Sequence, residues 1–403
     1  MTAAYHCEVA CSDEQMRALL PQWRRLQQRA GRDIHGFQTA HWAQSWLQAV
    51  QSSKNGQQGG CSPCILTVRD AKGELVLLWP LMREHYPLRL TVITWLSDPY
   101  GQYGDVLTSL SGEQLDAAMD VALRQLRRQG GDLVRLRHVR ADAAAFPWLS
   151  RRFRKSSDAC AAPWLDLAAF SSVEELEGRY SGKQRRRRRK LHKALTRHLG
   201  TEPRLRIMTS GQEVHAAISR IIACKRQWLK EKGLVSRALF SGHVEAFLHE
   251  LANNMPLGQT RDAHQPAFVI SVLEADGRQI SWEIGMRYQR RHYAYITAHE
   301  PEFTRFSIGR VHMDLAQQQA LRDGMKVFDL LVPDAPHKKS FSDHATPVSG
   351  FFLPLSMRGR LLGQTYLNHL RPFLRDVYHR IPPEIRRMLR LSDMVDHDHG
   401  MHH

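Results

Sequence analysis

Hydrophobic positions recur along the chain with two periods, one typical of helices and one typical of strands. Residues 13–28 and 37–50 have apolar side chains every three or four positions, so two amphipathic helices are expected near the start. Residues 64–82 contain two apolar runs around an Asp-Ala-Lys-Gly turn, which predicts a β-hairpin. A strand at 88–96, a helix at 113–129 and a strand at 132–139 complete a first α/β unit.

The second half of the chain repeats this order. A strand-like run at 163–167 precedes a basic helix at 180–199, and two further helices are expected at 215–232 and 242–253. Two long strands at 266–288 and 290–300 follow, then a glycine-bearing loop, a helix at 311–324 and a strand at 326–332. Identity between the halves is too low to define a sequence repeat, but the shared order predicts two copies of one α/β fold.

We therefore expect three regions. They are an N-terminal domain at 1–165, a C-terminal domain at 166–355 and a basic amphipathic segment at 356–403. That last segment alternates cations with apolar residues at helical spacing, so it fits either the surface of an anionic membrane or packing on its own domain. Its His-rich end is assigned no function.

Composition agrees with two folded domains. The chain has 403 residues, and a single core seldom grows past roughly 250 residues. The apolar content of 42% and the nine tryptophans favour a globular protein. The formal net charge of +17 attracts phosphates, nucleic acids and anionic lipid headgroups, so it selects the sign of the partner's charge.

Cysteine usage points to a reducing compartment. Six cysteines are scattered through a chain that shows no signal peptide, so we expect free thiols in the cytoplasm. Cys61 and Cys64 form a CxxC pattern that also occurs in redox and zinc sites, but no second ligand pair follows at zinc-finger spacing, and no metal is expected. No apolar run approaches the ~18 residues that span a bilayer. We therefore expect a cytoplasmic protein that can associate peripherally with the inner face of the membrane.

Five arginines stand in succession at 185–189. Three interpretations are open: a solvated helix face, a nucleic-acid or targeting arm, and a helix that binds an anion. Leu191, Leu195 and Leu199 follow at helical spacing, and such a stripe docks a helix on a core. A docked helix with successive cations repels itself unless anions are bound, so binding of phosphate or acidic lipid is preferred and a nucleic-acid reader is not expected. The expected anion-binding side chains are Arg185, Arg188 and Arg189.

A second candidate site lies between a predicted strand and a predicted helix. Ser307, Ile308, Gly309 and Arg310 occupy this loop. A helix N-terminus presents unpaired N–H groups and the positive end of its dipole, and glycine lets a phosphate approach the backbone. Polar residues also follow the next strand, where open α/β sheets bind their ligands. They are Asp329, Asp334, His337, Lys338 and Lys339.

Taken together, the basic helix, the strand–loop–helix at 292–331 and the segment PDAPHKKSF resemble the CelD-like (cellulose-biosynthesis) acyltransferase family of the GNAT superfamily. Members carry an Arg-rich helix, a Ser-Pro-Gly-like loop that opens a helix, and a Phe-Asp-Phe-Leu strand followed by a Tyr-Lys pair. The segments FQTAHWAQSWLQAV and YGQYGDVL look like the leading domain of that family, so the resemblance covers nearly the whole chain. The chain is also similar to the Fem-type aminoacyltransferases that build peptidoglycan bridges.

This resemblance implies an α/β fold of tandem GNAT-like domains, each a mixed twisted sheet flanked by helices. It implies that residues 307–310 form the pyrophosphate loop for coenzyme A, that Asp329 is the strand acid and that Lys338 is the lysine after it. Two positions depart from the family pattern. Ile308 stands where a proline is usual, and His337 stands where a tyrosine is usual.

The chemistry implied by the resemblance needs a held thioester, a deprotonated acceptor and a donor for the carbonyl oxygen. Main-chain N–H groups at the end of the strand YAYITAH are the expected donors, and a carboxylate or imidazole is the expected base. The candidate bases are Glu283, His299, Glu300 and His337. Asp329 is expected either to move a proton or to orient Lys338 or a substrate hydroxyl.

Three functions from different classes follow from these patterns. The preferred one is an enzyme that uses acyl-CoA to acylate an amine or hydroxyl of an envelope glycan (exopolysaccharide) or lipid precursor. The second is a Fem-like transferase whose donor is aminoacyl-tRNA, with the arginine helix gripping the RNA backbone. The third is a catalytically inactive regulator of polysaccharide synthesis built on the same scaffold.

Overall fold

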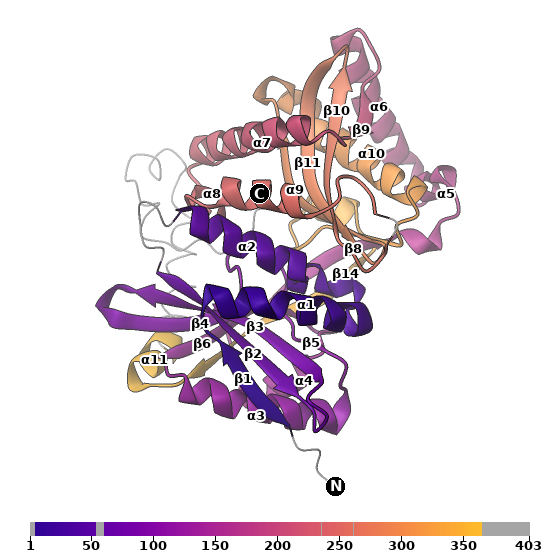
Figure 1. The fold of residues 1–403 in the computed structure, drawn as a ribbon. Helices are drawn as coiled ribbons and strands as arrows, with labels where there is room; N and C mark the ends of the chain where they lie inside the picture. Colours follow the sequence, from indigo (N-terminus) through magenta and orange to yellow (C-terminus); the bar gives the residue numbers. More distant parts are fainter. Residues whose placement is uncertain (1–4, 54–59, 235, 261, 365–403) are drawn as a thin grey trace. The chain divides into compact units, whose positions relative to one another are not determined.

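The computed structural model describes residues 5–53, 60–234, 236–260 and 262–364 (Figure 1). These residues form two compact units. Unit 1 contains the described residues up to Ala161 and those from Thr346 onward, and unit 2 contains Ala162–Ala345. Residues 346–355 therefore belong with the first unit, although the sequence pattern placed them in the second domain. The basic C-terminal segment from residue 365 lies outside the described residues.

The central part of unit 1 has, in chain order, a β-strand, two helices, three strands, a helix and a strand, and shorter elements are added to it. Its helices are α1 (Asp13–Ala30), α2 (Ala40–Ser53), α3 (Gly112–Arg128), α4 (Phe146–Arg152) and α11 (Met357–Leu361). Its strands are β1 (His6–Ala10), β2 (Cys61–Arg69), β3 (Leu75–Tyr86), β4 (Leu90–Trp95), β5 (Leu107–Thr108), β6 (Leu133–Arg140), β7 (Arg154–Lys155) and most of β14 (His344–Pro354). Short 3₁₀ helices lie at Asp33–Gln38 and Pro87–Arg89.

The sheet of unit 1 runs in the order β1-β2-β3-β4-β6-β14. The first four strands are antiparallel neighbours, and β6 pairs parallel to β4. Consecutive residues are buried along most of β2 and β3, which means that both faces of the sheet are covered there. Helix α1 packs on β2 and β3, while α3 packs on β1 and β2 (Figure 1).

Unit 2 uses the same order of elements. Its helices are α5 (Val173–Gly178), α6 (Gly182–Leu199), α7 (Gly211–Lys232), α8 (Arg237–Phe240), α9 (Val244–Asn254) and α10 (Ile308–Arg322). Its strands are β8 (Cys160–Asp166), β9 (Arg204–Ile207), β10 (Ala267–Ala275), β11 (Arg278–Tyr288), β12 (Arg291–His299) and β13 (Val327–Asp329). Short 3₁₀ helices lie at Leu167–Ala169, Pro301–Phe306 and Lys338–Ser340.

The topology of unit 2 repeats that of unit 1 strand for strand. The order is β9-β10-β11-β12-β13-β8, with antiparallel pairs up to β12 and a parallel pair between β12 and β13. In each unit a sixth strand, β14 or β8, pairs antiparallel with the strand that follows the central helix. The duplication expected from the order of elements is therefore visible in the pairing of the strands.

Two sequence expectations differ from the structure. The run at 266–288 was expected as one long strand, but it is two strands, β10 and β11, joined at Asp276 and Gly277. Both residues have positive φ angles of 50° and 72°, which is the geometry of a two-residue hairpin turn. The strands β1 and β14 were not expected. They are short or half-polar, and only pairing with distant residues makes them strands.

The basic helix α6 is docked on unit 2 by its apolar stripe. Leu195 is fully buried in a cluster with Ile308 and Val311 of α10, and Leu191 and Leu199 pack against the same cluster. This confirms the helix that the leucine spacing predicted. Ser181 caps its N-terminus by accepting from the N–H of Gln184, and Gly200 ends it in the left-handed conformation. The arginines of residues 185–189 are consequently held on a fixed helix.

Candidate active site

The central feature of unit 2 is a divergence of two parallel strands. β13 pairs with β12 only along Arg291, His292 and Tyr293, whereas β12 continues to His299. A register shift between Ile284 and Gly285 places a β-bulge in β12 just beyond this point, and such bulges bend a strand away from its neighbour. The main-chain edge of β12 beyond Tyr293 is therefore separated from β13.

A cavity of about 320 Å³ lies at this divergence. β12 contributes Ala294, Thr297 and His299 to its wall, and Leu330 lies on the side of β13. The remaining wall comes from the start of α10 and from the loop after β13. These residues are Thr304, Ser307, Ile308, Gly309, Arg310, Met313, His337, Lys338 and Phe341. An adjoining cavity of about 270 Å³ shares Thr297, His299, Gly309, Met313 and His337 with it and extends to α7.

The N-terminus of α10 faces this cavity. Ser307 precedes the helix with a left-handed backbone (φ 52°), and its side chain makes no capping hydrogen bond. The side chain of Ile308 is fully buried in the core cluster and anchors α10 there. A Cβ atom built on Gly309 meets no atom within 4 Å. The Cβ position of Gly309 thus faces open space in the first turn of α10, the part of a helix whose N–H groups bind anions. The N–H groups of Ser307 and Arg310 already donate to the main-chain oxygens of Thr304 and Ser307.

The loop after β13 closes the other side of the cavity. Arg310 donates to the hydroxyl of Ser340 at 3.5 Å. The amine of Lys338 is buried and donates to the main-chain oxygens of Leu331 (3.1 Å) and Pro333 (2.9 Å). Lys338 therefore holds the loop in shape, and its amine is directed at these carbonyls.

Two histidines line both cavities. Burial lowers the pKa of His337 below its ordinary value of 6.5, and the nearby cations of Lys338, Arg310 and Lys225 lower it further. Burial and the charge of Lys225 lower the pKa of His299 in the same way. His299 is hydrogen-bonded to the hydroxyl of Thr304 at 3.2 Å. His337 makes no side-chain hydrogen bond, ion pair or ring contact with the described residues, so its neutral imidazole is available to a ligand.

Lys225 is a site residue that the sequence pattern did not reveal. It lies on α7, is 5% exposed and lines the adjoining cavity. Burial lowers its pKa to about 8. In sequence it is one of four lysine and arginine residues in the last eight positions of α7, and only the helical spacing from Ile218, Ile221 and Ile222 could have indicated that it faces inward.

Glu283 is not part of this site, contrary to the expectation that it is a candidate base. It lies in the middle of β11 with 1% exposure and pairs with the ring of His292 at 2.6 Å. Its neighbours across the sheet are Ser271 and Thr297. Glu283 thus has almost no exposed surface for a substrate and lines neither of the two cavities. Glu300 lies beside the cavities but is bound by Arg220 through three hydrogen bonds of 2.6–2.9 Å.

Asp329 is also placed differently from the expectation. It is fully buried, pairs with Arg291 at 2.9 Å and accepts the N–H of Leu331 at 2.9 Å. It does not line the cavity that contains Lys338. The shared pocket expected for these two residues is therefore not found, because Arg291 and the N–H of Leu331 engage the Asp329 carboxylate away from that cavity.

The three arginines singled out on α6 divide into two groups. Arg188 forms an ion pair with Asp314, donates to the main-chain oxygen of Ser340 at 2.9 Å and stacks on Tyr180 at 3.6 Å from the ring centre. Burial lowers its pKa to about 10. It is a structural residue and not a free anion ligand. Arg185 and Arg189 make no hydrogen bond or ion pair with the described residues and line a separate cavity.

The corresponding strand junction of unit 1 is closed. The indole of Trp95 at the end of β4 donates to the main-chain oxygen of Arg137 at 2.8 Å, and Arg137 pairs with Asp98 at 2.7 Å. A Cβ atom on Gly104 would lie 2.1 Å from the ring of Trp95, which shows how tightly the loop packs on it. Only about 10 Å³ of space remains there. Unit 2 is therefore the unit with room for a substrate.

Within the described residues, no helix is long and apolar enough to cross a membrane. The same part of the chain holds no group of three or more His, Cys, Asp or Glu side chains arranged to bind a metal ion.

One family model matches the part of the chain that contains this site. Residues 182–339 match the family model described as acetyltransferase (GNAT) domain. No curated protein sequence matches the chain. The solved structure of FemX shares 11% identity with it at a TM-score of 0.54, over 89% of this chain and 98% of that one. A conserved protein of unknown function from Bacteroides thetaiotaomicron VPI-5482 shares 10% identity at a TM-score of 0.51, over 87% and 100%.

A tandem GNAT protein from the clavulanic acid biosynthesis pathway is also similar, with 10% identity and a TM-score of 0.47 over 88% of this chain and 99% of that one. At such identities the solved structures report on the fold alone. The matched region contains α6, the diverging strands, α10 and the loop that carries His337. The fold is a tandem arrangement of GNAT-like α/β units, and residues 182–339 of this chain are similar to GNAT acetyltransferase domains.

Proposed function

We propose that this protein is an acyltransferase that uses an acyl-CoA thioester to acylate an amine or hydroxyl of an envelope glycan or lipid precursor. The observation that carries the proposal is the cavity at the divergence of β12 and β13, which meets the open first turn of α10. This arrangement offers a slot for an extended thioester beside N–H groups suited to a pyrophosphate. The nature of the acceptor is an expectation from the CelD-like resemblance.

In this proposal, residues 307–310 hold the diphosphate of coenzyme A. The N–H groups of Ile308 and Gly309 contact it, the absence of a side chain at Gly309 lets it approach, and Arg310 adds a charged partner. Ile308 replaces the usual proline without loss of phosphate binding in this proposal, because its side chain packs in the hydrophobic core. The main-chain edge of β12 donates to the thioester oxygen as negative charge develops there.

His337 is the general base in this proposal. Its imidazole is neutral at pH 7, lines both cavities and has no competing partner among the described residues. It takes a proton from the acceptor as the acceptor nitrogen or oxygen attacks the thioester carbon. The carbon–sulfur bond then breaks, and coenzyme A leaves as the thiolate, which takes up a proton. His299 is the alternative base, and its hydrogen bond to Thr304 is the reason to prefer His337.

Calorimetric titration with coenzyme A tests the donor assignment. Gly309→Glu places a carboxylate where the diphosphate is expected. Because the two negative groups repel each other, we expect the affinity for coenzyme A to fall by at least about tenfold, which corresponds to about 1.4 kcal/mol. Gly211→Glu is the matched control, because Gly211 also opens a helix after a serine and also has no atom near its Cβ position. Equal affinity in both variants, with unchanged melting temperatures, would remove the assignment.

A second candidate function is transfer of an aminoacyl group from tRNA, as the Fem-type resemblance suggests. The exposed cations Arg186, Arg187 and Lys190 on α6 favour it, because a row of solvated cations suits an RNA backbone. Retention of tRNA at physiological salt, together with failure to bind coenzyme A, would select this function over the first.

A further inference from the structure

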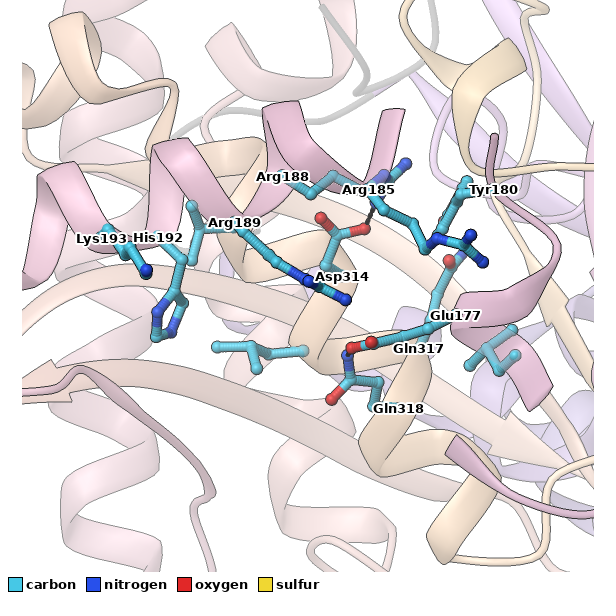
Figure 2. A pocket seen from close by; sticks show the side chains of 13 residues that line it. Glu177, Tyr180, Arg185, Arg188, Arg189, His192, Lys193, Asp314, Gln317 and Gln318 are labelled. Atoms are coloured by element: carbon cyan, nitrogen blue, oxygen red, sulfur yellow. Dashed lines mark hydrogen bonds and ion pairs between the residues drawn. The ribbon is translucent and has the colours of Figure 1, made fainter. Parts of the chain in front are cut away.

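A separate cavity of about 330 Å³ lies on a different face of α10, between α5, α6 and α10 (Figure 2). It shares no lining residue with the two cavities at the strand divergence. Val311, Leu315 and Gln318 of α10 face this cavity at helical spacing, whereas Gly309 and Met313 face the others. Arg188 stands between the two regions, since it lines this cavity and also contacts Phe341 of the other wall.

One wall of this cavity is cationic. Arg185, Arg189 and Lys193 follow one another at intervals of four residues along α6, so they lie on one face of the helix. None of them forms a hydrogen bond or ion pair with the described residues. Figure 2 shows the side chain of Arg189 extending from α6 toward Asp314 of α10, and the side chain of Arg185 extending toward Tyr180. Three like charges on one helix face repel each other, and an anion between them relieves that repulsion.

The carboxylates near these cations are already engaged. Asp314 is paired with Arg188, and Glu177 accepts from the side-chain amide of Gln318 at 3.0 Å. Arg188 in turn has its own partners in Asp314, Ser340 and the ring of Tyr180. The cavity therefore retains an excess of positive charge on the wall formed by α6.

The floor of the same cavity is apolar. Leu176 and Val311 are buried with 3% and 5% exposure, and Leu315 lies beside them half-buried. A small inorganic anion would leave this surface uncovered, and a neutral hydrocarbon would leave the cations without partners. A ligand that satisfies both surfaces carries a negative group and a hydrocarbon chain together.

We propose that this cavity binds an anionic amphiphile, in which a phosphate lies against Arg185, Arg189 and Lys193 and a hydrocarbon chain covers Leu176, Val311 and Leu315. The ligand is either the headgroup and upper chain of a membrane phospholipid or a soluble phosphorylated lipid precursor. Both sources share this chemistry. The site is independent of coenzyme A binding at the strand divergence.

The test is calorimetric titration of the full chain with octyl phosphate, inorganic phosphate and octyl glucoside below its micelle concentration. Octyl phosphate is expected to bind at least about tenfold more tightly than either of the other two, because only it contacts both surfaces. The double variant Arg185→Gln/Arg189→Gln is expected to weaken octyl phosphate binding by at least about tenfold. Coenzyme A affinity is expected to be unchanged in this variant.

The double variant Arg186→Gln/Arg187→Gln is the matched control. It removes the same charge from the same helix at exposed positions that do not line the cavity, so binding is expected to be retained. Co-sedimentation with phosphatidylglycerol vesicles and with phosphatidylcholine vesicles distinguishes the sources. Loss of phosphatidylglycerol binding in the first variant alone identifies the lipid headgroup, whereas octyl phosphate binding without vesicle binding identifies a soluble precursor.

Three results would overturn the proposal. The first is equal weakening by the two double variants, which would mean unspecific attraction to a basic helix. The second is inorganic phosphate binding as tightly as octyl phosphate, which would mean that the apolar floor takes no part. The third is no octyl phosphate binding by a folded parent protein, whether or not it binds tRNA.

Discussion

The guanidinium of Arg188 donates a 2.9 Å hydrogen bond to the main-chain oxygen of Ser340. This bond joins α6 to the loop after β13, two segments that are 152 residues apart in sequence. The same arginine is paired with Asp314 of α10. One side chain therefore ties together the basic helix, the central helix and the loop that carries His337.

The first prediction concerns this tie. Arg188→Ala leaves Asp314 without its partner in a setting where both side chains are about one-fifth exposed, so we expect a loss of about 2–3 kcal/mol in the free energy of unfolding. Arg186→Ala, on the solvated face of the same helix, is expected to stay within roughly 0.5 kcal/mol of the parent. Urea denaturation followed by tryptophan fluorescence measures both. Equal stability of the two variants would mean that Arg188 is as dispensable as its neighbours.

The second prediction concerns the proposed base. Because burial and nearby cations lower the pKa of His337 below 6.5, kcat/KM is expected to be constant above about pH 6.5 and to fall as the imidazole becomes protonated in acid. His337→Gln is expected to lower kcat/KM by about 10²–10⁴-fold. It is also expected to abolish the fall of kcat/KM at low pH, which is the acid limb of the pH profile. His299→Gln serves as the comparison. If the acid limb disappears in His299→Gln and persists in His337→Gln, the roles are reversed.

The third prediction concerns Lys225. Its charge lowers the pKa values of both His299 and His337, so Lys225→Met removes a cation that disfavours their protonation. The acid limb of the pH profile is expected to move to higher pH by roughly half a unit. Lys230→Met changes the same charge at an exposed position of α7 and is expected to leave the profile in place. A downward shift, or an equal shift in both variants, would contradict the assignment of Lys225 to the site.

The fourth prediction concerns stability in acid. Burial lowers the pKa of His312 from 6.5 to about 4, so the unfolded chain binds a proton that the folded chain does not between these two values. The neutral His312 therefore contributes to the free energy of unfolding above pH 6.5, and this contribution is lost as the pH falls toward 4. It amounts to at most about 3 kcal/mol.

His312→Gln is expected to flatten the fall in the urea midpoint between pH 6.5 and 4, whereas His264→Gln, at an exposed position, is expected to leave it unchanged. Identical pH slopes in the parent and in His312→Gln would show that other groups control the acid transition.

The fifth prediction concerns stoichiometry. Because Trp95 and its loop fill the strand junction of unit 1, we expect one coenzyme A per chain. Gly309→Glu lies in unit 2 only, so it is expected to weaken all of the detectable binding. A stoichiometry of two, or a site that keeps the parent affinity in Gly309→Glu, would show that unit 1 also binds the nucleotide.

Much of the candidate site could be predicted from local patterns. The glycine loop between a strand and a helix, and the polar segment after the next strand, identified residues that line one cavity in the structure: Ser307, Gly309, Arg310, His337 and Lys338. These patterns work because helix termini and strand ends are local features with fixed chemistry. The leucine stripe of α6 was predicted correctly for the same reason.

Other features were set only by distant contacts. Glu283 and Asp329 are acidic residues on strands near the site, and their enclosure by His292 and Arg291 depends on how the sheet is paired. Arg188 and Arg189 are adjacent and chemically identical, but successive residues of a helix are rotated by about 100°. Arg188 therefore pairs with Asp314, whereas the side chain of Arg189 forms no ion pair with the described residues.

The sequence by itself determined the order of elements, the duplicated α/β plan, the docked basic helix and the loop at the start of α10, because each of these follows from periodicity or from the chemistry of a chain segment. Only the tertiary structure decided that β14 belongs to unit 1, that the junction of unit 1 is filled by Trp95, and that Lys225 faces the cavity of unit 2. These depend on which residues far apart in the chain come into contact. A local pattern carries no information about that choice, since the burial of a side chain is a property of the neighbours that the fold brings to it.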